Sequence, residues 1–146
     1  MPQTPHYDVF ISHSSKDNQL AELLYAFLKE KGLSVWMDTY DIRPGEPYAK
    51  EIMAGLSRSS SMLLIYSANA CGSKDMKREA ANADKRNIPI VVFKIDQTPL
   101  VDEFEYYLAL DQWVVADTDP TGSFDTILAT LRKHLDKDAE PKRERL

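Results

Sequence analysis

Residues 62–79 read MLLIYSANACGSKDMKRE, and this stretch decides the fold. Its first five residues form a short apolar run, which predicts a strand buried on both faces of a sheet. A loop is expected over residues 67–72. Ser73 follows, and its hydroxyl can accept a free backbone N–H of a first helical turn, so a helix is expected to begin there.

One carboxylate in the predicted helix is out of place. Met76, Ala80 and Ala83 recur at helical spacing and form an apolar stripe, and Glu79 lies three residues after the first of them and four before the last. Two interpretations are open. Glu79 either leans to the edge of the stripe and reaches water, or it points into a cleft at the end of the strand and does chemistry.

Apolar periodicity predicts further strands and helices along the whole chain. Strands are expected at residues 7–11, 33–37, 88–95 and 112–115, and helices at residues 20–28, 48–57 and from Asp119 or Thr121 to Leu135, with residues 100–107 weakly helical or irregular. Gly32 is expected to end the first helix. Asp38–Pro47 is expected to be a loop, because it contains a glycine and two prolines.

Strands that alternate with helices predict an α/β fold. At this length the pattern indicates a flavodoxin-like doubly wound sheet of five parallel strands in the order 2-1-3-4-5, with helices on both faces. Ligands bind such sheets beyond the C-terminal ends of the strands, at the switch between strands 1 and 3. The loops at residues 12–17 and 67–73 are expected to meet there, close to Glu79.

Length and composition place limits on the kind of protein. The chain of 146 residues predicts one domain, which we expect at residues 7–135, between a disordered N-terminus at residues 1–6 and a charged tail or linker start at residues 136–146. The net charge of −5 argues against a nucleic-acid partner. A single cysteine favours a reducing compartment, hence the cytoplasm. No apolar run approaches the ~20 residues of a membrane span, so no membrane association is expected.

Several kinds of site found in such sheets lack support in the sequence. The predicted ends of strands 1 and 3 carry Ser12-His13 and Ser67, so the acidic residues of a phospho-acceptor site are missing. Neither a Gly-rich phosphate loop nor a dinucleotide fingerprint is present. The histidines lack metal-ligand spacing, so no metal is expected, and Cys71 has no evident base. A lone carboxylate among polar residues remains, which suits cleavage of an N-glycosidic bond whose leaving group is already activated.

Four segments, in order, resemble a Toll/interleukin-1 receptor (TIR) domain of the type common in bacteria. They are the opening strand YDVFISHSSKD (7–17), the second strand and BB loop GLSVWMDTYDIRPG (32–45), the segment SANACGSKDMKRE (67–79), which is similar to the family's Ser-x-Trp-Cys-x-x-Glu, and the strand IPI (88–90). The similarity covers roughly residues 7–135. Asp75 and Met76 depart from the pattern, because the family often has tryptophan and cysteine there. The loss of the tryptophan removes an aromatic face.

The family contains non-catalytic adaptors and enzymes that cleave NAD+ into nicotinamide and ADP-ribose or cyclic products. The resemblance implies the NAD+-cleaving branch, with NAD+ as substrate, no cofactor, and Glu79 as the catalytic residue. It further implies self-association with other TIR domains through the BB loop, Asp38–Pro47, a role in immune or antiviral defence, and room for a C-terminal sensor domain in a longer protein. The substrate-binding residues that it implies are Ser12, His13, Ser14, Trp36, Asp38, Arg43, Ser73 and Asp75.

Rival interpretations are open. A non-catalytic TIR scaffold would act through homotypic TIR–TIR contacts; the missing tryptophan favours it, whereas Glu79 and Asp38 favour the enzyme. A nucleoside deoxyribosyltransferase shares the fold type and a glutamate but has no further support. Trp36 suits a core position better than a stacking platform. Asp75 and Glu79 lie four residues apart on the predicted helix, so their like charges should raise the pKa of one of them.

Overall fold

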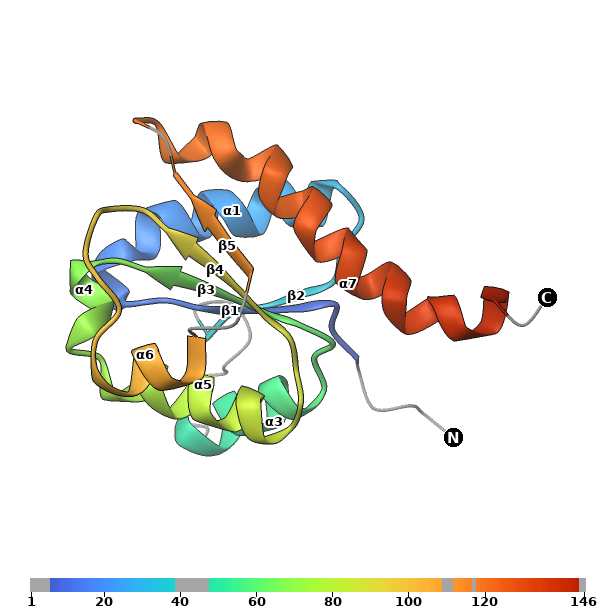
Figure 1. Cartoon of the computed structure of the whole chain (residues 1–146), viewed down its shortest axis with the longest axis horizontal. Coiled ribbons are helices and arrows are strands. Elements are labelled where there is room, and N and C mark those ends of the chain that lie inside the picture. Colours follow the sequence, from blue (N-terminus) through green and yellow to red (C-terminus); the bar gives the residue numbers. More distant parts are fainter. Residues whose placement is uncertain (1–5, 39–47, 109–111, 117, 145–146) are drawn as a thin grey trace.

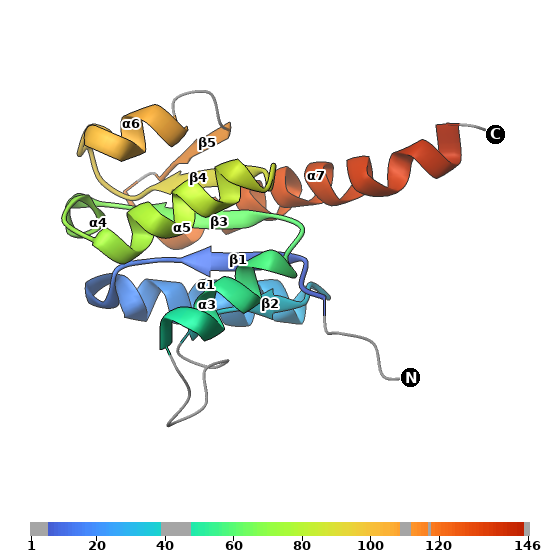
Figure 2. The ribbon, with the colours of Figure 1, turned by 90° about the horizontal axis from the view of Figure 1, so that it is seen from below.

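One parallel sheet forms the centre of the molecule. The computed structural model describes residues 6–38, 48–108, 112–116 and 118–144, with the side chains of Tyr48, Asp102 and residues 136–144 outside the description. Five strands pair in the order β2-β1-β3-β4-β5, all parallel. Helices cover both faces of the sheet (Figures 1 and 2). The predicted α/β fold and its strand order are confirmed.

The elements alternate along the chain. The strands are β1 (Val9–Ser12), β2 (Val35–Trp36), β3 (Met62–Tyr66), β4 (Ile90–Lys94) and β5 (Gln112–Val115). The helices are α1 (Asn18–Glu30), α3 (Tyr48–Ser57), α4 (Ala68–Cys71), α5 (Lys74–Lys85), α6 (Asp102–Leu108) and α7 (Phe124–Glu144), with the 3₁₀ turns η1 (Ser15–Asp17) and η2 (Pro120–Ser123). Within the described part of the chain, no helix has both the length and the apolar character that crossing a membrane requires.

Alternate strand side chains enter two different cores, because successive residues of a strand point to opposite faces. Val9 and Ile11 of β1 belong to the core that α1 and α7 cover. Phe10, between them, belongs to the core beneath α3, α5 and α6. All five residues of β3 are buried, which confirms the buried strand that the apolar run predicts. Figure 1 shows α1 and α5 on opposite sides of the sheet.

Two helix ends were predicted correctly because neighbouring residues set them. The Ser73 hydroxyl accepts a hydrogen bond from the backbone N–H of Met76 (3.1 Å), and α5 begins directly afterwards. Gly32 follows the end of α1 with φ of 94°, a conformation that strains any residue with a Cβ. The helix predicted over residues 48–57 is α3.

The expectation of a continuous loop over residues 67–72 was wrong. Residues 68–71 form the single-turn helix α4, and Ser67 caps it by accepting a hydrogen bond from the N–H of Asn69 (3.1 Å). A helix this short carries too few residues to show a periodicity. Ser67 was nevertheless a sequence signal for this helix, because the serine hydroxyl can cap a helix start.

Other predicted bounds were also inaccurate. The second strand covers only Val35–Trp36, because it lies at the edge of the sheet and pairs with just Val9 and Phe10 of β1. The fourth strand begins at Ile90, two residues later than predicted. Residues 102–108 are a regular helix, α6, and the last helix begins at Phe124 after η2 and continues to Glu144. Of the loop predicted at Asp38–Pro47, residues 39–47 lie outside the described residues.

Candidate active site

Glu79 points inward from α5. Its side chain is only 7% exposed, and the Ser12 hydroxyl at the end of β1 donates a hydrogen bond to its Oε1 atom at 2.6 Å. The helix start fixes this position, because Glu79 follows the Ser73 cap by six residues and so sits beside the apolar side chains that face the sheet. The carboxyl group therefore does not lean out into water, and it takes the inward orientation that the second interpretation of the sequence requires.

A cleft of about 430 Å³ opens beside this carboxyl group, at the C-terminal ends of β1 and β2. It is the place where doubly wound sheets bind ligands. Six residues that the sequence predicted for substrate binding line the cleft together with Glu79: His13, Ser14, Trp36, Asp38, Ser73 and Asp75. Ser12 contacts Glu79 directly. Arg43 lies outside the described residues.

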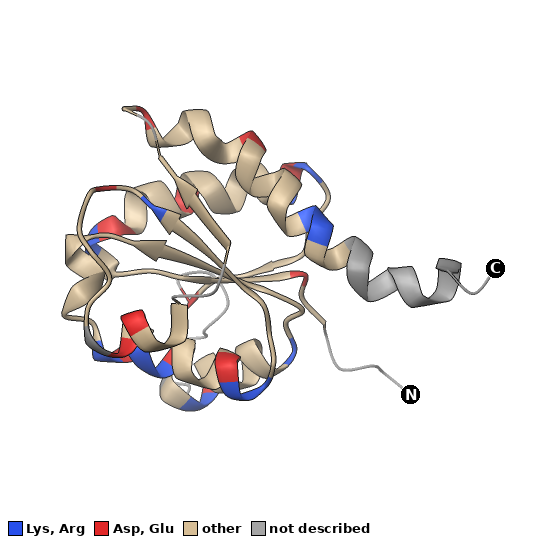
Figure 3. Cartoon of the chain, in the orientation of Figure 1, with Lys and Arg blue, Asp and Glu red and all other residues tan. Residues whose placement is uncertain are grey.

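Burial changes the acidity of Glu79. The pKa of its carboxyl group rises from the ordinary value of 4.5 to about 8, chiefly because the ionised form loses its contact with water. The hydrogen bond from Ser12 opposes this rise, and the nearby charges of Asp38 and Asp75 add to it. Figure 3 shows charged residues concentrated on the outer helices, while the strands are largely uncharged. A cation placed in the cleft would favour the ionised form of Glu79, because opposite charges attract.

The predicted effect of Asp75 on the pKa of Glu79 is correct in direction, but it is the smallest of the effects that act on this pKa. The charge of Asp75 does raise the pKa of Glu79. Burial is nevertheless the main cause of the rise, and the charge of Asp38 raises this pKa more than the charge of Asp75 does. Asp75 is exposed and lies 3.5 Å from Arg78 Nη1, in an ion pair on the surface of α5. The neighbouring cation and the water around it both weaken its effect.

Trp36 forms the floor of the cleft and is part of the core. Its ring stacks on Phe10 with centroids 4.8 Å apart and planes 5° from parallel, and it is 4% exposed. Another neighbour of Trp36 is Gly55 in α3, where an added Cβ would lie 2.4 Å from Trp36 Cε2. The glycine therefore allows the helix backbone to approach the indole ring, which agrees with the core position expected for Trp36.

Sequence reasoning missed the contacts that tie the two loops together. Asp17 accepts hydrogen bonds from Ser67 Oγ (2.6 Å) and Asn69 Nδ2 (2.9 Å), and so joins η1 after β1 to α4 after β3. The Asp17 side chain makes no capping bond at the start of α1, and Ser14 caps η1. Nothing local to Asp17 indicates partners some 50 residues away.

Six further lining residues were also not predicted: Phe10, Ile11, Ser15, Lys16, Asn69 and Gly72. Phe10 and Ile11 are strand residues whose apolar character indicates only a core. The remaining four residues could have been predicted to line the cleft, because they lie in the two loops expected to meet at this edge of the sheet: Ser15, Lys16, Asn69 and Gly72. Among the described residues, no group of three or more His, Cys, Asp and Glu side chains could hold a metal ion.

Comparison with protein families decides which fold family this sheet and cleft represent. A family model described as "TIR domain" matches residues 9–128. The chain belongs to the TIR-domain family. The resemblance carried by the four sequence segments is thereby confirmed, and the matched range lies within the residues 7–135 to which the resemblance was assigned.

Relatives of this TIR domain with assigned names are similar over part of the chain. A probable 2′ cyclic ADP-D-ribose synthase, TcpO, of Methanobrevibacter olleyae is 38% identical over 47% of this chain and 20% of that protein. The probable 2′ cyclic ADP-D-ribose synthase BdTIR of Brachypodium distachyon is 33% identical over 58% and 40%. The NAD(+) hydrolase PdTIR of Paracoccus denitrificans is 31% identical over 47% and 23%. The chain thus spans less than half the length of each of these proteins.

Solved structures with the same fold are more distant in sequence. The TIR domain of the Toll-related receptor TRR-2 from Hydra magnipapillata aligns with a TM-score of 0.69 at 18% identity, over 86% of this chain and 98% of that one. A metazoan TIR-STING receptor from C. gigas aligns with a TM-score of 0.73 at 19% identity, over 90% and 41%. At these identities the likeness establishes the fold.

Proposed function

We propose that this TIR domain hydrolyses NAD+ at the bond between nicotinamide and ribose, with Glu79 as the catalytic carboxylate. The observation that carries the proposal is a buried carboxyl group held by Ser12 at the inner wall of a cleft, at the C-terminal edge of the sheet. Relatives named NAD(+) hydrolase or 2′ cyclic ADP-D-ribose synthase support the same chemistry.

The reaction needs one carboxylate and no strong base. The bond between ribose C1′ and the ring nitrogen breaks, and its electron pair stays on nitrogen, so nicotinamide leaves as a neutral molecule. Positive charge develops on the ribose in an oxocarbenium-like state, which an ionised Glu79 stabilises. Water adds to C1′ and releases a proton to the solvent, which gives ADP-ribose.

The raised pKa of Glu79 fits a cationic substrate. A carboxyl group with a pKa of about 8 is largely protonated at neutral pH. The pyridinium charge of NAD+ in the cleft would favour the ionised form, so substrate binding itself would create the reactive state of the carboxylate. The Ser12 hydroxyl stabilises that state by donating to Oε1, and it also fixes the orientation of the carboxylate.

The product is ADP-ribose or a cyclic form of it. Cyclisation requires a nucleophile of the substrate itself to reach C1′ in place of water, and an aromatic side chain that stacks on a base would help to fold the substrate. Many TIR domains have a tryptophan at the position that Asp75 occupies here, and Asp75 is exposed at the cleft. We therefore expect linear ADP-ribose to dominate.

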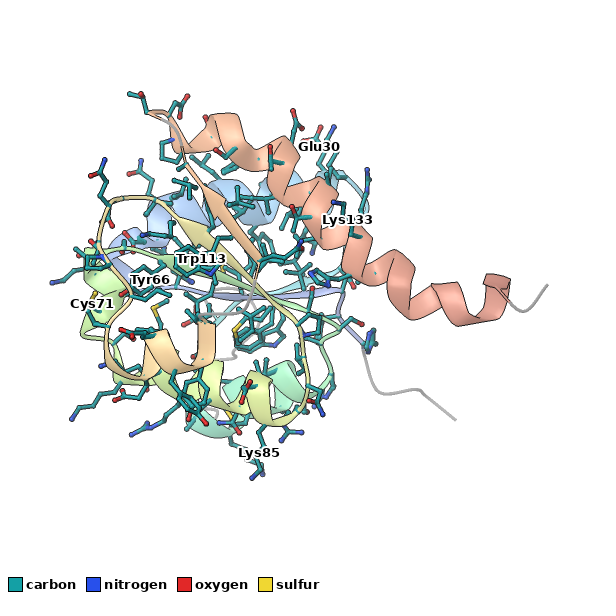
Figure 4. All side chains as sticks on the ribbon, in the orientation of Figure 1. Glu30, Tyr66, Cys71, Lys85, Trp113 and Lys133 are labelled. Atoms are coloured by element: carbon teal, nitrogen blue, oxygen red, sulfur yellow. The ribbon has the colours of Figure 1, made fainter. Side chains whose placement is uncertain are left out.

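The test compares two glutamate-to-glutamine substitutions. Glu79→Gln keeps the size of the side chain and an oxygen that can accept from Ser12, but it removes the charge. Glu30→Gln is the matched control, because Glu30 is exposed at the end of α1, on the other side of the sheet (Figure 4). We expect nicotinamide release to fall by at least about 100-fold in Glu79→Gln and to be unchanged in Glu30→Gln. Normal turnover of Glu79→Gln with an intact fold would contradict the proposal.

Self-association and a defence role complete the proposal. We expect specific activity to increase with protein concentration, because the resemblance implies a site completed by a neighbouring copy. A role in cytoplasmic immune or antiviral signalling is consistent with the relatives named disease resistance proteins RUN1 and RPV1 of Vitis rotundifolia, which are 28% and 30% identical over 65% and 51% of this chain. Activity that is independent of concentration would argue against assembly.

A further inference from the structure

The charged residues of the cleft are divided between two walls. Asp75 and Glu79 belong to α5, on one side of the sheet, and Asp38 lies two residues after the end of β2. Lys16 belongs to η1, which leads from β1 into α1 on the other side of the sheet (Figure 1). Among the described lining residues, Lys16 is the one lysine or arginine. The cleft therefore has an acidic wall on α5 and a cationic wall on η1.

Lys16 is free to bind a ligand. Its side chain is exposed, and no described residue forms an ion pair with it. The adjacent carboxylate of Asp17 is engaged elsewhere, since both of its oxygens accept hydrogen bonds, one from Ser67 and one from Asn69. Among the described residues of the cleft, the ammonium group of Lys16 is thus the cation available to an anion.

The geometry points to a single orientation of the dinucleotide, in which Lys16 binds the diphosphate while the cationic nicotinamide ring lies against the acidic wall of α5. This inference rests on the proposed function and names a specificity-determining residue for it. The reverse orientation would place the two negative charges of the diphosphate beside the carboxylate of Asp75, where like charges repel, and would leave Glu79 without the cation that favours its ionised form. Lys16 would accordingly make the cleft select a nicotinamide dinucleotide over a nicotinamide nucleoside.

The test uses two substrates that share the reacting bond. NAD+ carries the diphosphate, whereas nicotinamide riboside has the same pyridinium and ribose without any phosphate. Lys16→Gln should lower kcat/KM for NAD+ by about fivefold to tenfold, mainly through KM, because a charge-assisted contact is lost. The value for nicotinamide riboside should stay within about twofold, because that substrate never made the contact.

Two further variants separate charge from structure. Lys16→Arg keeps the positive charge and should restore most of the NAD+ value. Lys85→Gln removes a lysine from the far end of α5 (Figure 4) and should behave as the wild type with both substrates. Equal losses for NAD+ and nicotinamide riboside in Lys16→Gln, or no loss for either, would overturn the inference.

A binding measurement keeps this inference separate from the catalytic one. Calorimetric titration of ADP-ribose into the wild type and Lys16→Gln requires no turnover. Weaker binding to Lys16→Gln by about fivefold or more would support the diphosphate contact even if NAD+ were never cleaved. Equal affinity, or no binding to the wild type at millimolar concentration, would overturn it while leaving the role of Glu79 to its own test.

Discussion

Replacing Glu79 with glutamine should make the stability of the fold less sensitive to pH. In the wild type, burial raises the pKa of Glu79 from 4.5 to about 8, so between these values the folded state retains a proton that the unfolded chain releases. The free energy of unfolding therefore falls as pH rises through this window. Glutamine does not titrate, and it can still accept the hydrogen bond from Ser12.

The magnitude follows from the size of the shift. Each pKa unit corresponds to about 1.4 kcal/mol, and most of a shift from 4.5 to about 8 is expressed between about pH 5 and about pH 8. The wild type should accordingly lose about 3 kcal/mol relative to Glu79→Gln over this range. Unrelated titrations cancel, because they occur in both proteins.

Urea unfolding, followed by circular dichroism at several pH values, measures this difference. Glu30→Gln is again the control, since an exposed glutamate should leave the pH dependence of the wild type unchanged. A difference between wild type and Glu79→Gln that stays constant from about pH 5 to about pH 8 would refute the reasoning, because it would mean that Glu79 titrates alike in the folded and unfolded chain.

Two other predictions address the surroundings of Glu79. Because Glu79 must be ionised to act, kcat/KM for NAD+ should rise with pH up to about 8, the pKa of Glu79 in the free enzyme. Ser12→Ala removes the hydrogen bond that lowers this pKa, so the rise in kcat/KM should move to higher pH. An unshifted pH profile would count against the contact between Ser12 and Glu79. Gly55→Ala should lower the free energy of unfolding by about 1–3 kcal/mol, because its Cβ would lie 2.4 Å from the buried ring of Trp36. Gly122→Ala, where a Cβ meets nothing within 4 Å, is the control, and equal thermal midpoints of the two variants would contradict this account.

The sequence by itself determined the elements whose signals are local. Five consecutive apolar residues located β3, the hydroxyl of Ser73 located the start of α5, and Gly32 located the end of α1. Such signals succeed because each involves residues within a few positions of one another. The alternation of strands and helices then fixed the fold class, since a parallel sheet must be covered on both faces. A carboxylate within an apolar stripe was enough to mark Glu79 as unusual.

Only the tertiary structure decided how the site is arranged. The hydrogen bond that holds the Glu79 carboxyl group comes from Ser12, which lies 67 positions away in the chain, and the link between the two loops depends on Asp17 and Ser67, which lie 50 positions apart. The length of β2 depends on the residues of β1 that pair with it. Side chains distant in sequence meet only after the sheet has formed, and the burial that raises the pKa of Glu79 exists only in the folded chain. Neither these long-range contacts nor the extent of this burial can be predicted from composition and periodicity alone.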